Sequence, residues 1–225
     1  MSYVVVGFYT PNYAEIAEDF RRNLQDKAIP HHLYSVDRIG ETWIGETLRK
    51  PSIVLRAMED HPGKSIILMD VDCSVRGPLE PLLTDADVAL RLIHRRQKCS
   101  RASSVVVVFH PTEAARRLAE NWKRKCDDQI ARVRSMRIGR RRIMSRHLAI
   151  DDEVLLLDAL LSTPDLTIRN IQSDRLSEIV GHNSAHDQFA PPQKMVAAAK
   201  AALKAGRRRL VEIIVRQPYE EWKYR

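Results

Sequence analysis

The chain has 225 residues, of which 44% are hydrophobic, so it is long enough to bury the core of one full domain. Its three cysteines, Cys73, Cys99 and Cys126, are an odd number without metal-ligand spacing, which favours reduced thiols in a cytoplasmic protein. No apolar run approaches the roughly 18 residues that a membrane span requires, and we expect no signal peptide.

The net charge of +8 is unevenly distributed along the chain. Residues 123–146 contain ten Lys or Arg and two acids, and residues 194–225 contain nine Lys or Arg and three acids. The rest of the chain has 18 basic and 24 acidic residues and is therefore acidic. This asymmetry predicts a basic face for an anionic partner, such as an anionic or lipid-linked acceptor or the surface of an anionic membrane. A pair of solvated helix faces is the alternative.

Short apolar runs alternate with amphipathic stretches along the chain, which predicts strands and helices in turn. A polar connection is expected at 94–104, and a turn with a short helix at 73–83. We expect strands at 3–9, 32–36, 65–69, 88–93, 105–109 and 167–171, and helices at 13–26 (capped by Asn12), 50–59, from 112 to about Gly139, and 151–161.

This alternation predicts an α/β fold with a mostly parallel sheet and helices on both faces. We expect one domain at residues 1–190. Residues 191–225 are predicted to form a basic amphipathic helix and tail, packed on that domain or appended to it.

Asp70 and Asp72 follow directly after the apolar run 65–69. Ligands of α/β sheets bind beyond the carboxyl ends of the strands, and two carboxylates one residue apart can both coordinate one divalent cation. In the alternative interpretation, Asp70 caps a turn and Asp72 is solvated. No Gly-rich phosphate loop is present, so a bound diphosphate would need a cation and Lys or Arg side chains for neutralisation.

The order of these features resembles nucleotide-diphospho-sugar transferases of the GT-A fold, the Asp-x-Asp glycosyltransferases. It consists of a helix opening with Lys50 and Pro51, an apolar strand, Asp70-Val71-Asp72 and a Gly77-Pro78-Leu79 turn, and it covers roughly residues 3–190. The resemblance implies a GT-A-like fold and metal-dependent transfer of a sugar from a nucleotide-diphosphate donor, foremost a UDP-sugar. It also implies Mn²⁺ or Mg²⁺ as the cofactor.

The same resemblance implies roles for residues that are weak signals by themselves. Tyr9 and Thr10 would receive the nucleotide base, and Asp37 would contact ribose or base. Lys50 would reach phosphate, and Ser104 would lie near the donor sugar. Each has a structural alternative, such as a core tyrosine, a helix-start threonine, a turn aspartate or a solvated lysine.

Two later elements match the order of the family. Asp151-Asp152-Glu153 resembles an Asp-Asp-Gln element, in which Asp151 and Asp152 would stabilise the sugar or deprotonate the acceptor, although acids are also favoured in the first turn of any helix. Glu153 adds a charge that the family pattern lacks. Gly181-His182 resembles the late histidine that completes metal coordination, and it would suit manganese. His186, beside Asp187, competes with His182 for this role.

Two other classes of protein compete with this interpretation. In phosphatases of the haloacid dehalogenase type, the Asp-x-Asp normally follows the first strand and runs into Gly-Thr, whereas here it is followed by Cys73-Ser74. A nucleic-acid-binding protein would explain the basic segments, but these carry few aromatic residues for base stacking. Nucleic acid is therefore not the expected partner.

Overall fold

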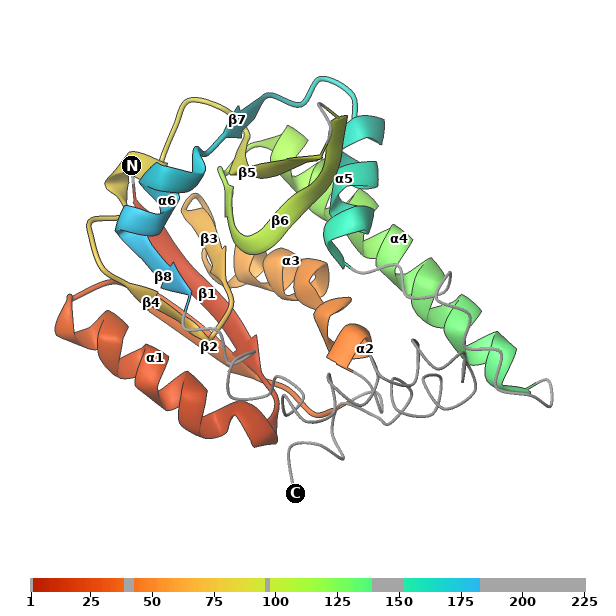
Figure 1. Cartoon of the computed structure of the whole chain (residues 1–225), viewed down its shortest axis with the longest axis horizontal. Coiled ribbons are helices and arrows are strands. Elements are labelled where there is room, and N and C mark those ends of the chain that lie inside the picture. The colour runs from red at the N-terminus through yellow and green to blue at the C-terminus, as the bar shows by residue number, and fades with distance from the viewer. Residues whose placement is uncertain (1, 39–42, 96–97, 139–151, 183–225) are drawn as a thin grey trace, which may run out of the picture. The chain divides into compact units, whose positions relative to one another are not determined.

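The computed structural model describes residues 2–38, 43–95, 98–138 and 152–182. Residues 1–39 and 44–183 form one compact unit. The helix predicted after residue 191 lies outside the described residues, as does Asp151. Strands and helices alternate along the described chain (Figure 1). The strands are β1 (Tyr3–Tyr9), β2 (His31–Ser35), β3 (Ser65–Met69), β4 (Cys73–Val75), β5 (Val88–Arg95), β6 (Lys98–Phe109), β7 (Ile168–Asn170) and β8 (Val180–His182).

Within the described residues, six α-helices and two short 3₁₀ turns connect these strands. They are η1 (Pro11–Tyr13), α1 (Ala14–Asp26), α2 (Trp43–Thr47), α3 (Lys50–Asp60), η2 (Glu80–Leu82), α4 (Glu113–Ile138), α5 (Asp152–Ser162) and α6 (Ser173–Ile179).

The main sheet has six strands in the order β2-β1-β3-β6-β5-β7. β1 is parallel to both β2 and β3, and β5 is parallel to β7, whereas β6 is antiparallel to both of its neighbours. The predicted mostly parallel sheet is therefore confirmed, with one reversed strand. A separate two-stranded antiparallel sheet pairs β4 with β8.

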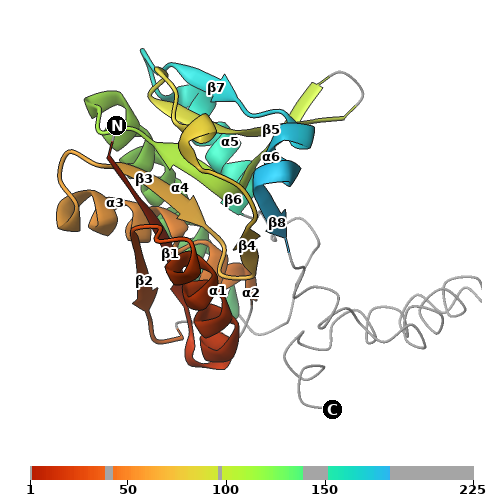
Figure 2. The ribbon, with the colours of Figure 1, turned by 90° about the vertical axis from the view of Figure 1, so that its left-hand side faces the viewer.

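Both faces of the main sheet are covered, as the alternating pattern predicts. One buried cluster joins Val4 and Val6 of β1 to apolar residues of α3, α4 and α5, with Trp122 fully buried among them. The intervening Val5 belongs to a second cluster with α1, β4 and the β8 region on the opposite face. Figures 1 and 2 show these two layers on either side of the strands. The side-chain period of two in a strand thus divides the core into two halves.

Three local predictions were wrong, each for a physical reason. The stretch 94–104 is not a connection but part of a hairpin, in which β5 and β6 pair as far as Arg95 and Lys98. Main-chain hydrogen bonds between the two strands form this part of the hairpin, so its strands need no apolar run. The region after Asp72 begins with the strand β4, whose partner β8 is about a hundred residues further along the chain. Asn12 does not cap α1; its side-chain oxygen instead accepts a hydrogen bond from the hydroxyl of Thr10 at 2.6 Å.

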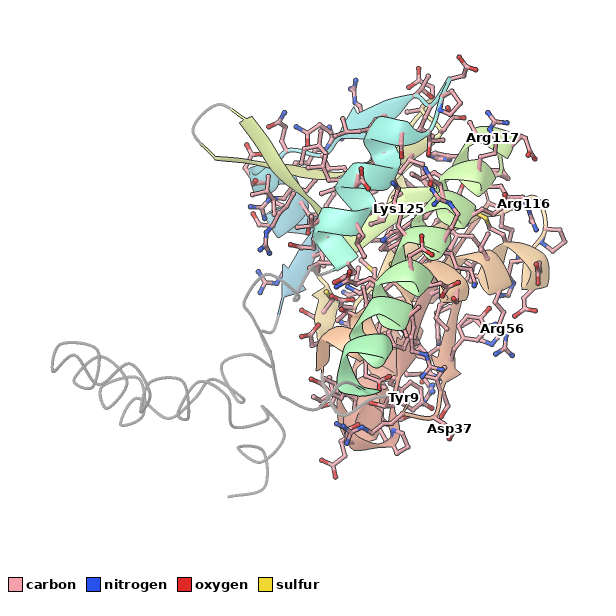
Figure 3. All side chains as sticks on the ribbon, turned by 90° about the vertical axis from the view of Figure 1, so that its right-hand side faces the viewer. Tyr9, Asp37, Arg56, Arg116, Arg117 and Lys125 are labelled. Atoms are coloured by element: carbon pink, nitrogen blue, oxygen red, sulfur yellow. The ribbon has the colours of Figure 1, made fainter. Side chains whose placement is uncertain are left out.

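The cations in the first part of the basic segment 123–146 are paired with acids. Lys123 lies 2.5 Å from Asp127, Lys125 lies 2.6 Å from Asp158, and Arg124 lies 3.7 Å from Asp128. Arg116 and Arg117, labelled with Lys125 along α4 in Figure 3, also have glutamate partners. The anionic contact predicted for this segment therefore rests on residues after 128, of which 139–146 lie outside the described residues. No helix in the described ranges is long and apolar enough to cross a membrane.

Candidate active site

The candidate site lies at the edge of the sheet where β3 ends. The β3–β6 ladder reaches its last pair at Met69 and Val106, and the amide of Asp70 then donates to the carbonyl of Val105 at 3.0 Å. β6 is irregular at this point, because its pairing with β5 jumps from Val107 to Ala102. This irregularity includes Ser104, whose side chain contacts α3 and α5 beside the end of β3.

Lys50 is the centre of the buried polar cluster at this edge. Its ammonium lies 2.8 and 3.1 Å from the two carboxylate oxygens of Asp70 and 3.2 Å from Oδ2 of Asp152. It also donates to the Ser104 hydroxyl at 2.9 Å, and that hydroxyl donates to Asp152 at 2.5 Å. The side chains of Lys50 and Asp152 are only 5% and 3% exposed, whereas that of Asp70 is 27% exposed. Asp70 is therefore the member of the cluster open to solvent.

The electrostatics of the cluster follow from this burial. Burial by itself would lower the pKa of Lys50, but the charges of Asp152 and Asp70 outweigh it and hold the pKa above its ordinary value. Burial raises the pKa of Asp70 to about 6; Lys50 opposes this rise, and the neighbouring Asp72 and Asp152 add to it. The site therefore combines an obligatory cation with a carboxylate that is costly to keep ionised.

Local sequence explains why these side chains converge. Pro51 favours a helix start at this point, which makes Lys50 the first residue of α3. Asp152 opens α5, and its carbonyl accepts a hydrogen bond from the indole of the buried Trp122 at 3.2 Å. Helices α3, α4 and α5 thus each fix one side of the cluster.

The second acid, Asp72, lies in the turn between β3 and β4. The amide of Cys73 donates to the carbonyl of Asp70 at 3.0 Å, which closes this turn. In the β4–β8 ladder, Cys73 pairs with His182 and Ser74 with Gly181. The fold therefore brings the backbone of His182 opposite Cys73, the residue that follows Asp72. In the sequence, Asp72 and His182 are 110 residues apart.

The described residues contain no group of three or more His, Cys, Asp or Glu side chains arranged to hold a metal ion. Asp70 and Asp72 supply two carboxylates, and the competing candidate His186 lies outside the described ranges. Magnesium is commonly held by one or two protein carboxylates together with substrate phosphates and water. Asp70 and Asp72 would supply the carboxylates for that mode of binding.

The residues predicted to receive the nucleotide lie at the same edge, where β1 and β2 end. Tyr9 is the last residue of β1, and its hydroxyl is hydrogen-bonded to Arg21. Thr10 is buried, with its hydroxyl bonded to Asn12. Asp37 is exposed, and its carbonyl accepts a hydrogen bond from Arg49. Figure 3 shows Tyr9 and Asp37 at the same end of the molecule.

Sequence reasoning did not identify two contacts that complete the cluster. The sequence predicts Trp122 to be a core side chain. Only the fold shows that its indole N–H donates a hydrogen bond to the carbonyl oxygen of Asp152. Arg101 lies 3.4 Å from Glu153, the acid that departs from the family pattern. Neither contact has a signal in a local sequence window, because each joins segments about 30 to 50 residues apart.

Comparisons with known proteins give distant structural similarity alone. No protein-family model matches the chain, and a search of curated proteins finds no match. A glycosyltransferase involved in glycosylation of the major capsid of PBCV-1 aligns with a TM-score of 0.45 and 11% identity over 55% of this chain and 66% of that one. The glycosyltransferase GlyE of Streptococcus pneumoniae aligns with a TM-score of 0.41 and 12% identity over 76% of this chain and 45% of that one.

A third similar structure is a Drosophila β1,4-galactosyltransferase 7 complexed with manganese, UDP-Gal and xylobiose. It aligns with a TM-score of 0.40 and 10% identity over 84% of this chain and 72% of that one. The chain spans two thirds or less of the first two proteins. Similarity at this level is too distant to assign a family.

Proposed function

We propose that this protein transfers a sugar from a nucleoside-diphosphate donor, foremost a UDP-sugar, in the presence of Mn²⁺ or Mg²⁺. The observation that carries the proposal is the gathering of Asp70 and Asp152 around Lys50 at the carboxyl end of β3, with Asp72 two residues beyond. This is the edge at which ligands of α/β sheets bind.

The charges of the cluster support a divalent cation. Lys50 with the three carboxylates of Asp70, Asp72 and Asp152 leaves two negative charges, which one divalent ion balances. Asp70 and Asp72 would hold the ion, with His182 as the third protein ligand. A bound ion would supply Lewis-acid neutralisation of the charge that develops on the departing diphosphate.

Within this proposal, Lys50 acts as a positioning residue. Because its ammonium is buried between two carboxylates, it keeps Asp70 and Asp152 side by side instead of reaching outward to phosphate. Asp152 would stabilise positive charge on the sugar through its fixed negative charge. Asp151 would meet the acceptor as a base, and Ser104 would place Asp152 beside the donor sugar.

The nucleotide would lie along the ends of β1 and β2. Tyr9 offers a ring for stacking, and the exposed carboxylate of Asp37 can accept hydrogen bonds from ribose hydroxyls. Thr10 is buried, so we propose that it contacts the base through its main chain.

Release of UDP or GDP from a panel of nucleotide sugars, with Mn²⁺ and then with EDTA, tests this function. We expect metal-dependent release in the parent protein and none in Asp72→Asn, while the matched surface variant Asp85→Asn behaves like the parent. Metal-dependent hydrolysis of p-nitrophenyl phosphate without any release from nucleotide sugars would instead favour a phosphatase and contradict the proposal.

We further propose that the basic segments 123–146 and 194–225 hold the protein at an anionic membrane surface. Binding to vesicles of phosphatidylserine and phosphatidylcholine should weaken with salt, and it should fall when Arg207, Arg208 and Arg209 become glutamine. Failure to bind such vesicles at low salt would contradict this contact.

A further inference from the structure

The small sheet of β4 and β8 begins directly after Asp72 and has two different faces. The side chains of Cys73 and Val75 are buried in the apolar cluster that includes α1. Because side chains alternate along an extended chain, Ser74 and Arg76 belong to the opposite face, where Ser74 is half-buried and Arg76 is exposed. This outer face of β4 therefore extends from the second acid of the candidate site.

The guanidinium of Arg76 occupies the space beside Gly181 where a side chain would otherwise lie. A Cβ added to Gly181 would be 2.6 Å from Cζ and Nη2 of Arg76 and closer still to Nε. In the ladder Gly181 is opposite Ser74, whereas Arg76 lies beyond the last pair of β4. The guanidinium therefore reaches back along β4 by about two residues, roughly 7 Å at the usual rise, towards Asp72.

Arg76 differs from Lys50 in how its charge is compensated. The ammonium of Lys50 is buried between Asp70 and Asp152 and is therefore not available to a phosphate group. Within the described residues, the guanidinium of Arg76 has no hydrogen bond or ion pair with an acid, and it is open to solvent. A diphosphate bound without a Gly-rich loop needs such a cationic side chain in addition to a metal ion.

We propose that Arg76 binds the diphosphate of the donor, in the role that the sequence suggested for Lys50. The planar guanidinium matches phosphate oxygens with two parallel hydrogen bonds, and it would neutralise negative charge on the diphosphate as the sugar departs. Gly181 is the positioning residue, because the absence of a side chain there lets the guanidinium lie close to Asp72. This inference rests on the proposed function and adds a donor contact to it.

Calorimetric titration with UDP in the presence of Mn²⁺ tests the inference. The variants are Arg76→Gln, Arg76→Lys, Gly181→Ala and the double variant Arg76→Gln/Gly181→Ala. Arg22→Gln is the control for loss of an exposed arginine. Gly77→Ala is the matched control for the added methyl group, because a Cβ at Gly77 would make only ordinary contacts.

We expect Arg76→Gln to weaken UDP binding by at least about tenfold, and Arg76→Lys to weaken it less, because lysine keeps the charge but not the paired hydrogen bonds. Gly181→Ala should also weaken binding, since the methyl group displaces the guanidinium, and the double variant should be no weaker than Arg76→Gln alone. Both controls should bind UDP like the parent. The unfolding midpoint and the Mn²⁺ affinity measured without nucleotide should stay unchanged in Arg76→Gln, which separates a phosphate contact from a structural role.

Parent-like UDP affinity in Arg76→Gln would overturn the inference and leave the proposed function standing. Additive losses in the double variant would overturn the positioning role of Gly181. A parallel titration with inorganic pyrophosphate and Mn²⁺ separates the inference from the proposed function. If the parent binds pyrophosphate through Arg76 but binds no UDP, the proposed function fails and the phosphate contact stands; if it binds neither anion, both fail.

Discussion

Replacing Lys50 with methionine tests the electrostatics of the buried cluster directly. The substitution keeps the length and apolar stem of the side chain but leaves Asp70 and Asp152 without their shared cation. Removing one partner of a buried ion pair costs about 3–5 kcal/mol of stability. Because Asp70 is partly open to solvent, we expect the lower end, about 3 kcal/mol near neutral pH.

The loss should depend on pH in a defined direction. Lys50 lowers the pKa of Asp70, so its removal should raise that pKa further above the unfolded value of about 3.9. A carboxyl whose folded pKa is raised keeps its proton in the folded state at pH values where the unfolded chain has already released it. The stability that this proton contributes is lost as the pH rises through the folded pKa. Lys50→Met should therefore be less destabilised at about pH 5 than at about pH 8.

Urea unfolding in metal-free buffer at both pH values measures this effect, with Lys27→Met as a control at an exposed lysine. A loss below about 1 kcal/mol, or the same loss at both pH values, would refute the assignment of Lys50 as the cation that holds the two carboxylates together.

Three further predictions concern other parts of the structure. Gly7→Ala should destabilise the fold by about 1–3 kcal/mol, because an added Cβ would lie 2.8 Å from a main-chain oxygen of β3. Gly77→Ala should not destabilise it, because a Cβ added there would make only ordinary contacts. Equal losses of stability in the two variants would contradict this prediction. Burial lowers the pKa of His110, so stability should fall as pH drops below about 6.5, and a His110→Gln variant with the parent's pH profile would contradict this. His182→Ala should weaken manganese affinity more than His186→Ala, and the reverse order would exclude His182 as a ligand.

Much of the fold follows from local pattern. The strands at β1 and β3 end where the apolar runs end, and α3 and α5 begin within a residue of their predicted starts. These elements are recognisable because a buried parallel strand is a continuous apolar run and because Pro51 marks a helix start. β4, β8 and the outer hairpin were not predicted, since their stability comes from pairing between strands and not from the composition of either strand.

The candidate site was predictable in its residues but not in its contacts. Lys50, Asp70, Ser104 and Asp152 were each proposed from sequence, and the structure brings all four together. Their arrangement was not predictable, because Lys50 was expected to face phosphate and is instead enclosed by two carboxylates. An ammonium on a flexible four-carbon stem carries no sequence signal for the direction in which it points.

We propose that Asp70 and Asp72 bind a divalent cation, which would bridge to a nucleoside diphosphate. Calorimetric titration of UDP into the parent protein and into Asp72→Asn, with and without Mn²⁺, tests it most directly. We predict binding to the parent only when Mn²⁺ is present, and none to Asp72→Asn, whose unfolding midpoint should match that of the parent. Metal-independent binding to the parent, or unchanged affinity in Asp72→Asn, would contradict the claim.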